Sequence, residues 1–173
     1  MNSNFVKCYH FCNEDFYNNL IAQKEIIAND NINIPEFKYK HAEHYVKEFV
    51  FINKRLNGGN GMFFAWSNPS YKGEIEFNNN GKYYLLELNV PEDICIKTHY
   101  ENWCSFGMDL YDVDGDIEEA DALCREQFGI KNGLEGSYEA IFEINTQDEI
   151  QILMPYIKKD WINSVFKCNN MNR

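Results

Sequence analysis

The sequence has few basic residues and no long apolar run, and both shortages exclude classes of protein. Lys and Arg number 16 against 27 Asp and Glu, so the formal net charge is −11. A protein that grips a nucleic-acid backbone needs a basic face, so broad backbone binding is excluded, although a single nucleotide could still enter a pocket. No stretch of about 18 apolar residues occurs, so no membrane contact is expected.

The N-terminus lacks the basic region and the apolar run of a signal peptide. No internal repeat and no Pro- or Ser-rich linker interrupts the 173 residues, which predicts a single domain over 1–173. The six cysteines are even in number, but a chain of this length with 45% hydrophobic residues buries a core without disulfides. We therefore expect reduced thiols and a cytoplasmic location.

Local patterns near the N-terminus predict a strand followed by a capped helix. Residues 5–12 are aromatic and β-branched, as is typical of a strand. Asn13 is a good N-cap, with acidic Glu14 and Asp15 in the first turn of the helix that follows. Pro35 can open a second helix, whose apolar stripe continues to Leu56.

The rest of the chain alternates between strand and helix patterns. Strand signals cover residues 62–66, 74–77 and 82–90, the last two joined as a hairpin, and later residues 149–154 and 161–168. Short helices are predicted over 117–128, and from a Ser137 cap through Phe142. Strands in the middle and at the end, with helices early and inserted, predict an α+β fold with a mostly antiparallel split sheet and flanking helices.

Two short segments carry candidate chemistry. Cys8, His10 and Cys12 are spaced to share one face of a strand, but a closed zinc site needs four ligands, so no metal is expected and buried cysteines are the plainer interpretation. Glu149 and Gln151 would share a face of a later strand. A carboxylate beside an amide can hold ribose hydroxyls or stabilise an oxocarbenium-like centre, and the alternative is the solvent face of an edge strand.

Three blocks of the sequence carry a resemblance to known proteins. They are residues 63–66, residues 85–92 with Trp103 eleven positions later, and residues 137–142 with 149–151 and 161–165. These blocks, which cover roughly residues 45–168, resemble an uncharacterised family of bacterial and phage proteins, a domain of unknown function. They depart from the family at Phe64 and Tyr138, where Trp is usual, and the resemblance brings no established activity.

A second resemblance carries chemistry. Residues 9–12 followed by a capped helix look like the opening of DarT-like ADP-ribosyltransferases. This resemblance implies an ADP-ribosyltransferase-like fold, NAD as the substrate, His10 on the NAD ribose, and Glu149 or Gln151 in the catalytic position. Tyr9 or Trp66 would hold the nicotinamide, and Ser67 and Trp103 complete the candidate cofactor-binding set.

The spacing to Pro155 places Gln151, rather than a Glu, in the catalytic position of that family. A Gln cannot stabilise positive charge as a carboxylate does, so the site could bind a nucleotide without transferring anything. Two hypotheses follow. The chain is an NAD-dependent transferase that modifies a protein or nucleotide acceptor, or it is a non-catalytic acidic interaction protein, such as a bacterial or phage defence or counter-defence factor. The first requires His10 and the pair formed by Glu149 and Gln151 to face one cleft.

Overall fold

The computed structural model describes residues 4–28, 52–56, 61–69, 82–100, 117–126, 129–144 and 149–168. Within the span predicted as one domain, the residues gather into two compact units. Unit 1 comprises residues 1–29, 56–96 and 151–173, and unit 2 comprises residues 30–55 and 97–150. The described elements confirm the α+β class with a mostly antiparallel sheet. None of the described helices is long and apolar enough to cross a membrane.

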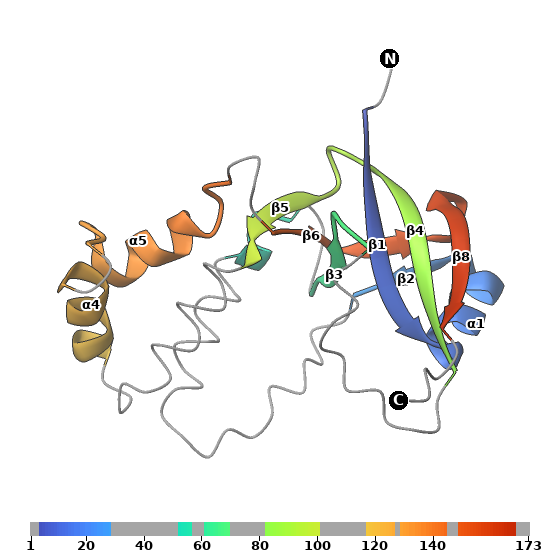
Figure 1. Cartoon of the computed structure of the whole chain (residues 1–173), viewed down its shortest axis with the longest axis horizontal. Helices are drawn as coiled ribbons and strands as arrows, with labels where there is room; N and C mark the ends of the chain where they lie inside the picture. Colours follow the sequence, from blue (N-terminus) through green and yellow to red (C-terminus); the bar gives the residue numbers. More distant parts are fainter. Residues whose placement is uncertain are drawn as a thin grey trace. The chain divides into compact units, whose positions relative to one another are not determined.

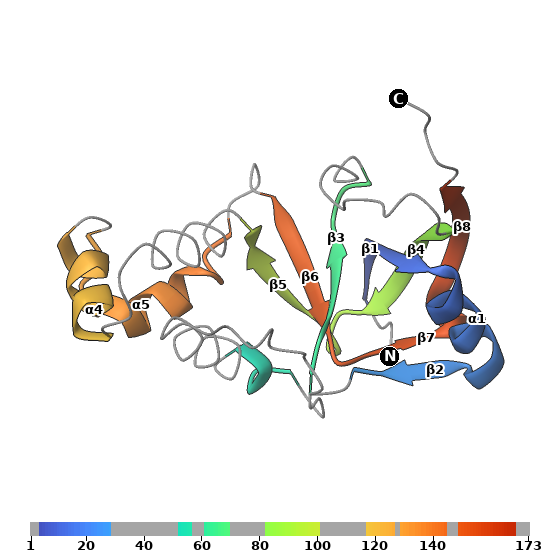
Figure 2. The same cartoon turned by 90° about the horizontal axis from the view of Figure 1, so that it is seen from below.

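Unit 1 is built on antiparallel strands in the order β6-β3-β1-β4-β8 (Figures 1 and 2). The chain therefore places its first strand in the middle of the sheet, between strands from the centre of the sequence. The strands are β1 (Phe5–Asn13), β3 (Phe63–Trp66), β4 (Tyr83–Pro91), β6 (Ile150–Met154) and β8 (Ile162–Cys168).

The predicted strand and cap at the N-terminus are confirmed. β1 is followed by helix α1 (Glu14–Gln23), and the Asn13 side chain accepts a hydrogen bond from the Phe16 backbone N–H at 2.8 Å. Lys24 ends the helix in the left-handed conformation, with φ of 69°, and donates its N–H to the Leu20 carbonyl oxygen. The cap satisfies one of the amide groups that a helix leaves without a partner at its start.

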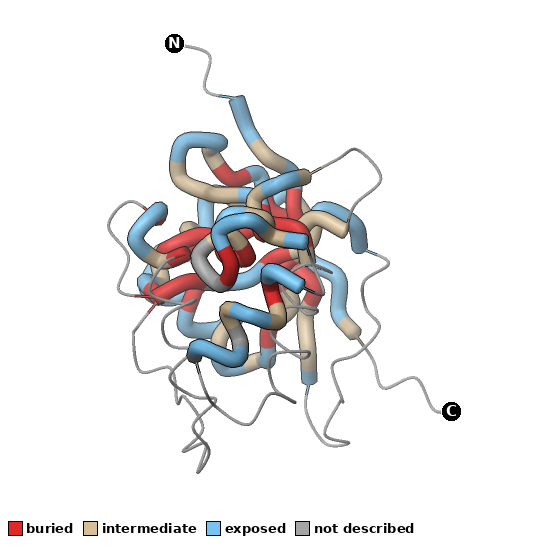
Figure 3. Tube along the Cα trace, turned by 90° about the vertical axis from the view of Figure 1, so that its left-hand side faces the viewer, coloured by how far each residue is buried: buried red, intermediate tan, exposed pale blue. Residues whose placement is uncertain are grey.

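The two faces of the sheet differ in burial. Along β1, Cys8, His10 and Cys12 are buried and lie on what we call the rear face, while Tyr9 and Phe11 alternate with them on the front face. On the same face of β4, Leu86, Leu88 and Val90 are fully buried. Figure 3 colours these buried residues red. The rear face therefore carries the main apolar core of unit 1.

Helix α1 and a two-stranded ribbon lie on the rear side of β1 and β4, as Figures 1 and 2 show. The ribbon pairs β2 (Glu25–Ile27) with β7 (Tyr156–Lys158), and short helix η1 (Lys159–Trp161) leads from β7 into β8. Phe16 of α1 packs against the ring of His10, and Tyr17 stacks on Tyr84 at 4.5 Å. These contacts attach the helix to the rear face.

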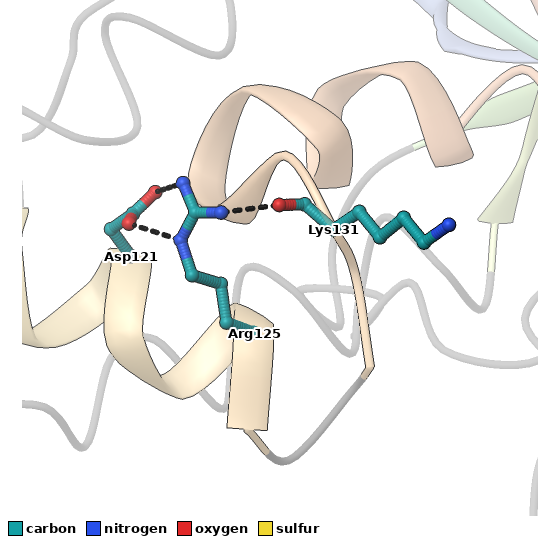
Figure 4. Close-up of polar contacts among 3 residues, drawn as sticks. All are labelled: Asp121, Arg125 and Lys131. Carbon is teal, nitrogen blue, oxygen red and sulfur yellow. Dashed lines mark hydrogen bonds and ion pairs between the residues drawn. The ribbon is translucent and has the colours of Figure 1, made fainter.

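In unit 2, helix α4 (Ile117–Glu126) precedes helix α5 (Gly133–Ala140), and strand β5 (Ile96–His99) ends in this unit. The Arg125 guanidinium binds the Asp121 carboxylate and the carbonyl oxygen of Lys131 (Figure 4). Gly133 has a φ of 57°, and a Cβ there would lie 1.8 Å from Oδ1 of Asp121. Glycine takes this left-handed conformation without strain, and any larger residue would also have to displace the Asp121 carboxylate.

The predicted cap at Ser137 is wrong, because Ser137 lies inside α5 and is fully buried. The strand predicted over 82–90 is confirmed as β4, but its neighbours are β1 and β8, from the two ends of the chain. The helix predicted from Pro35 to Leu56 lies among the described residues only over 52–56, where Ile52 and Asn53 are helical and Ile52 and Leu56 are buried. The rest of that helix and the hairpin partner over residues 74–77 lie outside the described residues.

Candidate functional site

The strand register brings three of the predicted site residues onto one face of the sheet. Tyr9 pairs with Trp66, and Trp66 pairs with Gln151, so these side chains share the front face of β1, β3 and β6. On the other side of β1, Tyr9 pairs with Glu87 of β4. The four residues form one row across four neighbouring strands.

His10 lies on the rear face, opposite to Gln151. Its Nδ1 lies 2.7 Å from the carbonyl oxygen of Phe64, and since a carbonyl oxygen only accepts, Nδ1 carries the proton. The ring is packed between Phe16 at 5.3 Å and Phe63 at 5.8 Å. Burial lowers the pKa of His10, and the hydrogen bond to Phe64 opposes that shift only in part. The imidazole is therefore a neutral core group.

The expectation that His10 and Gln151 face one cleft is wrong for this pair, because the register places them on opposite faces of the same sheet. The alternative of a solvent-facing Gln151 is also wrong, since its residue is only 6% exposed. β6 is buried along most of its length and has β3 as a neighbour, so alternation in its sequence does not indicate an exposed side.

Ser67 is exposed directly after β3, and Trp103 lies outside the described residues. Glu149 belongs to unit 2, where its carbonyl oxygen accepts a hydrogen bond from the Tyr100 N–H at 2.9 Å. Its assigned catalytic role stays a prediction.

Sequence reasoning missed Glu87, a charged residue of the front face whose carboxylate is bound by two side-chain donors. Its carboxylate is 2.9 Å from the Lys7 ammonium and accepts a hydrogen bond from the Asn163 side-chain amide. The Tyr9 hydroxyl also hydrogen-bonds to it. The Lys7 and Asn163 donors lower the pKa of Glu87, so the group is an ionised acceptor. A charged residue within the apolar run of residues 85–88 is the signal that could have identified it.

The front face also gathers aromatic side chains, none of which is buried. We call this set the aromatic face. Phe11 stacks on Tyr83 at 5.3 Å, and Lys7 lies 5.7 Å from the ring centre of Tyr9. Phe64 is 37% exposed and Phe166 is 50% exposed. The members of the aromatic face are Tyr9, Phe11, Phe64, Trp66, Tyr83 and Phe166.

The cysteines beside His10 are buried thiols. Burial raises the pKa of both Cys8 and Cys12 to about 12, so neither is a thiolate at neutral pH. Among the described residues, no group of three or more His, Cys, Asp or Glu side chains is placed to hold a metal ion. Within that part of the chain, the rear face is therefore a packed core with no metal-binding group.

Comparisons with known proteins give one weak similarity. The chain is 26% identical over 160 residues to a protein from Aspergillus niger named phosphatidylethanolamine N-methyltransferase. The aligned region covers 86% of this chain but only 14% of that protein. No family model matches, and no solved structure matches. At this identity and coverage, the similarity does not show a family for this chain.

Proposed function

We propose that the chain is a non-catalytic acidic interaction protein that binds a basic protein partner through the aromatic face. The observation that carries this choice is the separation of His10 from Gln151 on opposite faces of one sheet. The transferase hypothesis requires the imidazole beside the NAD ribose, but the imidazole is buried between phenylalanine rings.

The aromatic face supports binding because exposed aromatic clusters are typical of protein interfaces. Phe64 and Phe166 supply exposed apolar area, and Tyr9 and Trp66 combine apolar area with a polar group. The net charge of −11 favours a partner of opposite charge, because complementary charge speeds encounter and disfavours wrong partners. The proposal includes a cytoplasmic setting and a role such as a bacterial or phage defence or counter-defence factor.

A capture experiment with matched variants tests this proposal. The immobilised full chain is exposed to bacterial lysate, and bound proteins are eluted with salt. We expect retained proteins with a pI above about 9, and we expect Phe64→Ser and Phe166→Ser to lose them. Ile27→Ser is the matched control, because Ile27 is 59% exposed on the β2–β7 ribbon and lies outside the aromatic face. Equal retention by all variants would exclude the aromatic face as the binding surface.

NAD-dependent ADP-ribosyl transfer on an ADP-ribosyltransferase-like fold is the second candidate, and the row formed by Gln151, Trp66, Tyr9 and Glu87 favours it. The rings could hold a nicotinamide, and an ionised carboxylate beside them could stabilise positive charge. In this arrangement Glu87 competes with Glu149 for the catalytic role. Nicotinamide release from NAD that Glu87→Gln abolishes and Glu149→Ala does not would support transfer at this row.

A further inference from the structure

Strand β8 forms an end of the unit 1 sheet. One side of it pairs with β4, from Tyr83 with Cys168 to Leu88 with Ile162. Among the described residues, no strand pairs with the other side. Such an edge presents a row of backbone N–H and C=O groups that can pair with another strand.

This edge carries apolar side chains on both faces. Val165 is 39% exposed and Phe166 is 50% exposed, and as neighbours in a strand they point to opposite faces. Natural edge strands usually carry charged residues or proline, which prevent pairing with a strand of another chain. β8 contains no Asp, Glu or Pro and has Lys167 as its one charged residue. The bulge at Asn163 lies near the start of the strand, so residues 164–168 continue regularly.

We propose that β8 is a self-association edge, at which a second copy of this chain pairs antiparallel with β8 about a two-fold axis at Val165. Val165 then faces the same residue of the second copy, and Ser164 faces Phe166, both within the regular stretch of the strand. No two like charges lie directly opposite each other in this register. The strand is therefore complementary to itself, as a two-fold interface requires.

The pairing extends the sheet and keeps the two front faces on the same side, since the axis is perpendicular to the sheet. Phe166 belongs to the aromatic face, so the two aromatic faces become neighbours across the new strand pair. A seven-residue strand with its flanking side chains buries less than the roughly 1,200 Å² typical of stable interfaces. The dimer is accordingly weak and depends on concentration.

The effect of salt on binding distinguishes the two possible occupants of this edge, a second copy of the chain and a basic strand of another protein. Each copy carries a net charge of −11, so two copies repel at long range. Salt screens this repulsion, and the dimer becomes tighter as ionic strength rises. A basic foreign strand would instead be released by salt.

Sedimentation equilibrium of the full chain at low and high salt tests the proposal. We expect a monomer–dimer equilibrium that tightens with salt, together with amide exchange in β8 that slows as protein concentration rises. Val165→Lys places two like charges on the axis and should weaken the dimer about tenfold or more. Phe5→Lys is the matched control, since Phe5 is 58% exposed at the start of β1, and it should dimerise like the wild type.

A wild type that stays monomeric at every concentration and salt level overturns the proposal. So does a Val165→Lys dimer as tight as that of the wild type, or a dimer that salt dissociates. If Val165→Lys fails to fold, the concentration dependence of β8 amide exchange in the wild type still decides the question. The inference does not depend on the proposed basic partner, because the assay contains this chain alone.

Discussion

The Nδ1–H of His10 donates to the carbonyl oxygen of Phe64 across 2.7 Å, which joins the rear side of β1 to β3. The same strand pair carries Tyr9 and Trp66 on its front side. One strand therefore serves two purposes, with a core histidine behind and an aromatic surface in front. The imidazole contributes to stability as a neutral hydrogen-bond donor.

This contact predicts that stability falls in mild acid. Burial holds the pKa of His10 below its unfolded value of about 6.5, so the unfolded chain binds the proton more readily. The stabilising contribution is present above pH 6.5 or so and is lost as pH falls through the folded pKa, at no more than about 1.4 kcal/mol per pH unit. Urea unfolding from pH 7.5 downwards measures it.

His10→Asn is the matched variant, since its amide can still donate while it does not titrate. The difference in unfolding free energy between wild type and variant should shrink as pH falls. A constant difference across the pH range would show that His10 titrates normally in the folded chain.

The buried thiols predict selective labelling. Cys8 and Cys12 are buried with raised pKa values, whereas Cys95 and Cys168 are partly exposed. In brief treatment with iodoacetamide at pH 8, Cys95 and Cys168 should be alkylated first, as peptide mass spectrometry would show. Alkylation of Cys8 in the native protein as fast as Cys95 would mean that the rear face is open. Adding urea should remove the difference and serves as the control.

The cap of α1 predicts a measurable loss of stability. Asn13→Ala removes the side-chain acceptor of the Phe16 N–H and should cost about 1 kcal/mol. Asn13→Asp keeps an acceptor and should retain most of the stability. Asn18→Ala, at an exposed position inside the helix, should be neutral or slightly stabilising. Thermal melts of the three variants measure these effects. Equal melting temperatures for Asn13→Ala and Asn18→Ala would contradict a stabilising cap at Asn13.

The Glu87 network predicts a second pH dependence. The pKa of Glu87 is lowered by Lys7 first and then by Asn163, so its stabilising effect is present above about pH 4.3 and is lost as pH falls through the lower folded pKa. Glu87→Gln should melt at a lower temperature than the wild type at pH 7. This difference in melting temperature should be smaller near pH 3. Asp93→Asn, at an exposed position, is the control. Equal melting temperatures for Glu87→Gln and Asp93→Asn at pH 7 would show that the Glu87 network does not stabilise the sheet.

Local patterns predicted the elements whose signals are themselves local. The two-residue alternation of β1, the Asn13 cap and the strand over residues 82–90 follow from neighbouring side chains alone. These features need no knowledge of the rest of the fold.

The arrangement of the site was not predictable in the same way, because it depends on pairing between distant strands. A shift of one residue in register moves every side chain of a strand to the other face of the sheet. No local signal determines whether Gln151 and His10 lie on the same face. Ser137 shows the same limit in a helix: its capping propensity is overridden, and it is buried inside α5.

Titration of the full chain with NAD, followed by calorimetry and by nicotinamide release, tests the central claim most directly. Because His10 is a buried core group and Gln151 faces the other way, we predict no saturable heat and no nicotinamide release. Saturable NAD binding with nicotinamide release that Glu149→Ala abolishes would contradict the account and restore the transferase.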